Sequence, residues 1–85
     1  MVFLELMTRK DCHLCDVAKD VINRVIRNFP AELKLTDIEE NPELMESYSE
    51  RIPVLLIEGK ESFVYKVHEI TLRRKMERAL REKEG

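Results

Sequence analysis

The hydrophobic residues fall into segments with two different periods. Val2 to Met7 is a short apolar run with one charge, Glu5, and it predicts a buried strand with Phe3 in the core. From Leu14 onward apolar residues recur every three to four positions, which predicts a helix with one buried face that ends at Pro30. That face consists of Ala18, Val21, Ile22, Val25, Ile26 and Phe29.

A second strand and a short helix follow. Residues 32 to 38 predict a strand in which Leu33 and Leu35 face inward. Asn41 and Pro42 are typical of a helix start, because Asn caps the free backbone N–H groups and Pro suits the first helical position. The apolar side of this helix consists of Leu44, Met45 and Tyr48.

The last third of the chain predicts a hairpin and a helix. Val54 to Ile57 is an unbroken apolar run, typical of a central strand covered on both faces. Residues 58 to 60 predict a tight turn, and residues 62 to 66 return antiparallel. A final helix begins near His68 or Glu69. Its buried residues are expected to be Leu72, Met76, Ala79 and Leu80.

The predicted element order is therefore β-α-β-α-β-β-α. The first two strands flank a helix and should be parallel with a right-handed crossover, whereas the last two form a hairpin. We expect an α/β fold with a central four-stranded mixed sheet flanked by helices. A chain of 85 residues has room for one core, so residues 1–85 are expected to form a single domain.

Composition and charge limit the classes of partner and the cellular location that we expect. Fifteen Lys and Arg against seventeen Asp and Glu leave no basic excess for a phosphate backbone, so we expect no nucleic-acid partner. No run approaches the roughly 18–20 apolar residues of a membrane span, and we expect no membrane partner. Met1 to Glu5 lacks the basic flank and cleavage site of a signal peptide, which favours the cytoplasm. The absence of Gln and the many charged residues favour a thermophilic source, unless they reflect chance in a short chain.

Two cysteines, Cys12 and Cys15, lie where the first strand is expected to turn into the first helix. A helix N-terminus offers free amide N–H groups and the positive end of the helix dipole, and both stabilise a thiolate. The pKa of Cys12 is therefore expected below the value of about 8.5 for a free thiol. Nearby charges act in both directions: Arg9, Lys10 and a protonated His13 lower this pKa, and Asp11 and Asp16 raise it.

This spacing predicts dithiol–disulfide exchange. Cys12, before the first turn, would attack a disulfide, and Cys15, on the buried side, would resolve the mixed disulfide. Two alternatives remain. One is a structural pair, and the other is half of a metal site completed by His13, His68, Asp11 or Asp16. A structural zinc site usually needs a second ligand pair at recognisable spacing, and none is present, so we expect no metal.

Three segments resemble a known family, the small glutaredoxin-like proteins of the thioredoxin superfamily. Residues 8 to 15 are similar to the glutaredoxin active-site segment, and residues 37 to 48 to the second strand and helix of thioredoxins. Residues 51 to 54, Arg-Ile-Pro-Val, are similar to the loop whose cis-proline faces the cysteines. The resemblance implies a thioredoxin fold and a thiol–disulfide oxidoreductase, with Cys12 and Cys15 catalytic. The residues it implies in substrate binding are Pro53, Ile52, Arg51, Arg9, His13 and Leu14.

The resemblance also implies the partners. The substrate is expected to be a protein or peptide disulfide, or a glutathione mixed disulfide, and electrons would come from glutathione or a reductase protein. No cofactor beyond the dithiol is expected, and the chain should be a monomer. The double glycine that binds glutathione in glutaredoxins is absent, so Arg9 and Arg51 are the candidate ligands for its carboxylates. The alternative function is a non-enzymatic redox-sensing or protein-binding module with the same fold.

Overall fold

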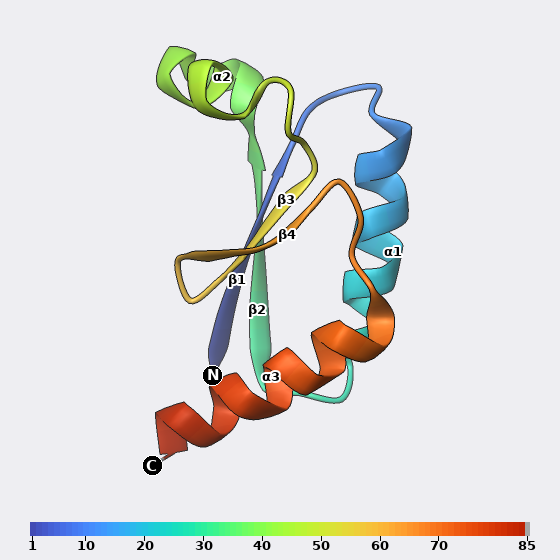
Figure 1. The fold of residues 1–85 in the computed structure, drawn as a ribbon, viewed down its shortest axis with the longest axis vertical. Coiled ribbons are helices and arrows are strands. Elements are labelled where there is room, and N and C mark those ends of the chain that lie inside the picture. The colour runs from blue at the N-terminus through green and yellow to red at the C-terminus, as the bar shows by residue number, and fades with distance from the viewer. Residues whose placement is uncertain (85) are drawn as a thin grey trace.

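A computed structural model describes residues 1–84 and confirms the predicted element order (Figure 1). The order includes a short 3₁₀ turn, η1, that the sequence pattern did not predict. The elements are β1 (Val2–Thr8), α1 (His13–Ile26), β2 (Ala31–Asp37), η1 (Ile38–Glu40), α2 (Pro42–Tyr48), β3 (Val54–Ile57), β4 (Lys60–Val64) and α3 (Glu69–Glu84).

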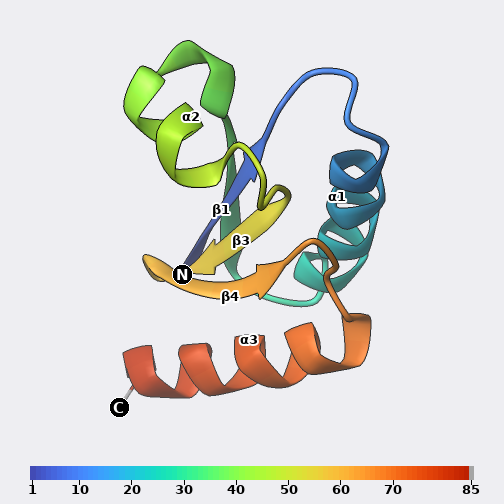
Figure 2. The same ribbon diagram turned by 45° about the horizontal axis from the view of Figure 1, so that its top comes forward.

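The four strands form one mixed sheet in the order β2-β1-β3-β4. β1 pairs with β2 in parallel, as expected for strands joined through a helix, and β3 pairs antiparallel with both β1 and β4. Because β1 and β2 run in the same direction, their carboxyl ends lie at the same end of the sheet. The chain leaves β1 at this end and enters α1, which places the cysteines there (Figures 1 and 2).

Two hydrophobic clusters, one on each side of the sheet, hold the layers together. The larger cluster joins alternate residues of the strands to α1 and α3, and the smaller one joins the other face to α2. Figure 2 shows α3 and α2 on opposite sides of the strands. All four residues of β3 are buried, which confirms that this strand is covered on both faces.

Two predictions of buried residues are wrong, for different reasons. Phe3 was expected in the core, but its side chain is 51% exposed. The helix α2 has only seven residues and packs at the end of the sheet near Met7 and Val54, so it does not reach Phe3. Leu35 was expected to face inward, but it is 49% exposed because β2 is an edge strand.

The start of α2 agrees with the prediction from the sequence, whereas the end of α1 does not. The Asn41 side chain accepts a hydrogen bond from the Glu43 N–H at 2.9 Å, and Pro42 is the first helical residue, as predicted. The first helix, however, ends at Ile26 rather than near Phe29. The backbone tightens before Pro30, and the Phe29 N–H donates to the Ile26 carbonyl at 3.1 Å in a three-residue turn.

The hairpin turn between β3 and β4 is held by charged contacts to β1 and α3. Glu58 and Gly59 both have positive φ, as a type I′ turn requires. The Glu58 carboxylate accepts a hydrogen bond from the Phe3 N–H at 2.7 Å and pairs with the Lys83 ammonium at 3.0 Å. The backbone hydrogen bond from Phe3, and next the Lys83 ammonium, lower the pKa of Glu58 below its ordinary value.

This lowered pKa predicts a pH-dependent contribution to stability. The folded protein binds the Glu58 proton more weakly than the unfolded chain, so the carboxylate stabilises the fold above the ordinary carboxyl pKa. The contribution disappears as pH falls through the lowered pKa of the folded state. Glu58→Gln should therefore lower the Tm at pH 7, and the difference from wild type should vanish at acid pH. Glu77→Gln, an exposed change on α3, is the control, and an equal Tm difference at both pH values would contradict the account.

Candidate active site

The two cysteines lie at the start of α1 and are joined by a disulfide, with their Cα atoms 5.2 Å apart. Cys12 is the N-cap residue in extended conformation, and its Sγ accepts a hydrogen bond from the Cys15 N–H at 3.2 Å. Cys12 is partly exposed, whereas Cys15 is 1% exposed. Attack on a disulfide requires an accessible sulfur, and resolution requires a second sulfur that is shielded from the substrate. The exposures of Cys12 and Cys15 fit these two roles.

The position of Cys12 follows from how helices begin. An N-cap side chain normally offers an oxygen to the unpaired N–H groups of the first turn, and here the sulfur takes that place. The same N–H group and the helix dipole would stabilise negative charge on the sulfur after reduction. The helix end itself therefore provides the electrostatic environment that thiolate chemistry needs.

An open groove of about 600 Å³ lies in front of Cys12. Its lining residues come from three segments that meet at the carboxyl ends of β1 and β2 and at the start of β3. They are Arg9, Lys10, Asp11, Cys12, Glu39 and Ile52. Cys12 lines this groove, whereas the buried Cys15 does not.

The loop before β3 forms one wall of this groove. The Ile52–Pro53 peptide bond is cis, as predicted. Pro53 is fully buried, and its carbonyl accepts a hydrogen bond from the Tyr65 N–H at 2.8 Å, so it lies against the end of β4. Ile52 is the loop residue that lines the groove together with Cys12.

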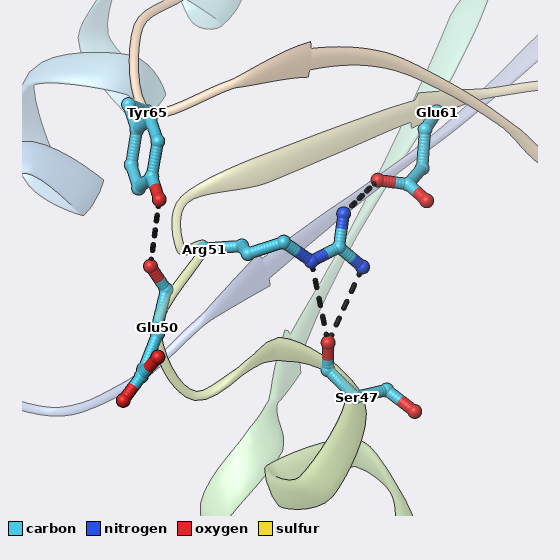
Figure 3. Close-up of polar contacts among 5 residues, drawn as sticks. All are labelled: Ser47, Glu50, Arg51, Glu61 and Tyr65. Atoms are coloured by element: carbon cyan, nitrogen blue, oxygen red, sulfur yellow. Dashed lines mark hydrogen bonds and ion pairs between the residues drawn. The ribbon is translucent and has the colours of Figure 1, made fainter.

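The other predicted site residues lie in different places, and only one of them lines the groove. Arg9 lines the groove, and His13 and Leu14 are exposed on the first turn of α1. Arg51 is not among the lining residues of the groove. Its guanidinium is directed toward Ser47 on one side and Glu61 on the other (Figure 3).

Sequence reasoning missed Glu39 as a groove residue. It lies in η1, just after β2, and a topological signal was available: the carboxyl ends of parallel strands share one end of the sheet, where open α/β folds bind ligands. No comparable signal in the sequence indicated that Tyr65 contacts the loop before β3. Its contacts depend on β4 pairing with β3, which no local pattern around residue 65 specifies.

Asp11 places a negative charge in the groove that Cys12 lines. It lines the groove with Cys12 and has a φ of 56°, a left-handed conformation that Asp and Asn tolerate better than most residues. Asp11→Asn should preserve this backbone while removing the charge, so the pKa of the Cys12 thiol should fall. The thiolate absorbance of the reduced protein, followed through a pH titration, measures this shift.

A matched change further along α1 provides the control for Asp11. Asp20→Asn removes the same charge from an exposed position on α1, about two turns beyond Cys12. The two variants should differ because Coulombic effects on an exposed thiol weaken with distance and screening. Equal titration curves for both variants and the wild type would show that Asp11 does not influence Cys12.

Within residues 1–84, no three His, Cys, Asp or Glu side chains are grouped so that they can hold a metal ion. Among the helices of that same range, none is long and apolar enough to cross a membrane.

Comparison with known proteins identifies the family. Residues 3–77 match the model of the glutaredoxin-like domain (DUF836). A search of curated protein sequences finds no significant relative. Among solved structures, protein XcR50 from X. campestris is 28% identical with a TM-score of 0.74, and the match covers 89% of this chain and 97% of that one. Protein Ne2328 from Nitrosomonas europaea is 26% identical with a TM-score of 0.76, covering 88% and 91%.

Thioredoxins share the fold at lower identity. A mutant thioredoxin from Halobacterium salinarum is 23% identical with a TM-score of 0.65, and the match covers 92% of this chain and 74% of that one. A thioredoxin-like fold that carries a Cys-x-x-Cys pair at the start of its first helix suggests a redox function. The family match covers most of the chain, and the chain belongs to the glutaredoxin-like (DUF836) family of thioredoxin-fold proteins.

Proposed function

We propose that this protein is a thiol–disulfide oxidoreductase that exchanges its Cys12–Cys15 dithiol with a substrate disulfide. The Cys12 thiolate attacks one sulfur of the substrate, which forms a mixed disulfide and releases the other substrate sulfur as a thiolate. The Cys15 thiolate then attacks the Cys12 sulfur, closes the Cys12–Cys15 disulfide and releases the second substrate thiolate. Two electrons pass from the protein to the substrate.

The observation that carries this proposal is the unequal exposure of two linked cysteines. Cys12 is partly exposed at an open groove, and Cys15 is buried behind it on α1. Cys15 is within bonding reach of Cys12 but out of reach of a large substrate. This is the division between attacking and resolving thiol that the two-step reaction needs.

The substrate class in this proposal is a protein or peptide disulfide, with a glutathione mixed disulfide as the second possibility. Arg9 and Lys10 give the groove positive charge, and Asp11 and Glu39 oppose it. A groove of mixed charge suits an extended peptide backbone better than a ligand of one strong sign. The oxidised protein would be reduced again by glutathione or by a reductase protein, in the cytoplasm.

Turnover of model substrates tests the proposal. The reduced wild-type protein, with a dithiol as the terminal reductant, should accelerate the reduction of a protein disulfide such as that of insulin. A glutathione mixed disulfide on a peptide is assayed in parallel. Acceleration of neither substrate would contradict the enzyme proposal. Reversible Cys12–Cys15 oxidation without turnover would instead support a redox-sensing module.

A further inference from the structure

We propose that Arg51 is a positioning residue, which holds the loop at residues 50–53 in place beside Cys12, rather than a ligand for a substrate carboxylate. The inference rests on the proposed function and deepens it. It also favours a protein disulfide over a glutathione mixed disulfide as the substrate, because the guanidinium already has partners within the protein.

The first contact ties the loop to α2. The Nε and Nη2 groups of Arg51 donate to the Ser47 carbonyl at 3.3 and 3.2 Å. That carbonyl belongs to the last turn of α2, where backbone oxygens have no helical partner. The guanidinium also lies 5.0 Å from the centre of the Tyr48 ring, in the geometry of a cation–π contact. Arg51 therefore closes the C-terminal end of α2 against the loop.

The second contact ties the same side chain to β4. Nη1 of Arg51 pairs with the Glu61 carboxylate at 2.6 Å, so every nitrogen of the guanidinium has an acceptor within the protein (Figure 3). Arginine presents its donors as a rigid planar fork, which can link two fixed acceptors in a way that a lysine ammonium cannot. A substrate carboxylate that binds here would have to share the guanidinium with the Glu61 carboxylate, whose negative charge repels it.

Tyr65 holds the loop from the other side. Its hydroxyl donates to the Glu50 carbonyl at 2.8 Å, and its backbone N–H donates to the Pro53 carbonyl at 2.8 Å. These carbonyls belong to the first and last residues of the loop. Figure 3 shows Tyr65 and Glu61 on different sides of it. The loop is thus fixed to α2 and to β4.

Fixing the loop matters because it forms a wall of the groove. Ile52 of the loop and Cys12 line the same groove, so a shift of the loop changes its width where the substrate must lie. A small misplacement of a positioning element lowers rates strongly even when the reacting groups are intact. Arg51 and Glu61 are both partly exposed, and exposed ion pairs contribute little to global stability. Their loss should therefore affect the reaction more than the Tm.

A double-mutant cycle tests the proposal with Arg51→Ala, Glu61→Gln and the double variant. Each single change should lower kcat/KM for a protein disulfide by about tenfold, and the double variant should be no worse than either. The reaction of Cys12 with a small aromatic disulfide, which needs no groove, should stay within about twofold of wild type. Arg51→Lys should behave like Arg51→Ala, because a lysine ammonium cannot link Ser47 and Glu61 as the planar guanidinium does. Arg78→Ala, which removes the exposed ion pair with Glu82 on α3, is the control.

Different results would overturn the proposal. If Arg51 binds a substrate carboxylate, Glu61→Gln will match the wild type, whereas Arg51→Ala will raise KM for a glutathione mixed disulfide alone and Arg51→Lys will largely restore it. Additive losses in the double variant would also contradict it. The proposed function fails separately, by inactivity of the wild-type protein toward both substrates.

Discussion

Replacing Cys12 with Ser is expected to lower the rate of disulfide reduction by about a thousandfold or more. The serine hydroxyl is not ionised near neutral pH, so the helix N-terminus has no anion to stabilise, and an oxygen cannot form the mixed disulfide. The N-cap hydrogen bond to the Cys15 N–H survives, because serine is a favoured N-cap residue. The variant should therefore remain folded, and the loss is measured as insulin disulfide turnover beside a circular dichroism melt.

Cys15→Ser is the matched comparison. The buried serine leaves Cys12 free to attack but removes the resolving thiol, so the first step should proceed. Turnover of a protein disulfide should fall well below that of the wild type but not to the Cys12→Ser level, because release of the substrate then depends on the external dithiol. Equal residual turnover in both serine variants would show that the two cysteines are equivalent. That result would contradict the division of roles derived from their exposure.

Leu55→Ala is expected to lower the free energy of unfolding by about 2–5 kcal/mol. Leu55 lies in the central strand β3, is 0% exposed and belongs to the larger cluster under α1 and α3. It pairs across the sheet with Leu6 on one side and Phe63 on the other, so truncation leaves a cavity that these strands cannot readily fill. In a chain of this size, the change is a large part of the total stability.

Leu35→Ala is the control for this prediction. It removes the same atoms from the edge strand β2, where the leucine is half exposed, and should cost about 1 kcal/mol or less. Urea unfolding followed by circular dichroism measures both variants, provided that the slope with denaturant stays unchanged. Similar losses in the two variants would contradict the placement of the core on β3.

The parts of the fold that could be predicted are those with strong local causes. The uniform apolar run of β3 reflects coverage on both faces, and Asn41 with Pro42 marks a helix start by capping and by fixed φ. The cysteine pair could be placed because the polar break after β1 and the helical period that follows locate the helix start. In each case, the physical cause lies within a few residues of the effect.

The features that could not be predicted are contacts between elements that lie far apart in the sequence. Alternation along β1 puts Phe3 on one face of the sheet, but it does not say whether a helix covers that face, and α2 is too short to do so. Nothing in the sequence indicated the intramolecular partner of Arg51 either, and the role of Arg51 toward a substrate stays a prediction. Its partner Glu61 comes from β4, which reaches Arg51 only through the pairing of strands β3 and β4. Side-chain partners of this kind are set by topology.

The most direct test of the account is the mass of the covalent adduct that reduced Cys15→Ser forms with a disulfide-linked peptide dimer. We expect one stable adduct of a single peptide, located at Cys12 by peptide mapping and released by a dithiol. The wild-type protein should release the peptide and close its own disulfide under the same conditions. Failure of the Cys15→Ser variant to form the adduct, or equal accumulation of the adduct in the wild type, would contradict attack by Cys12 with resolution by Cys15.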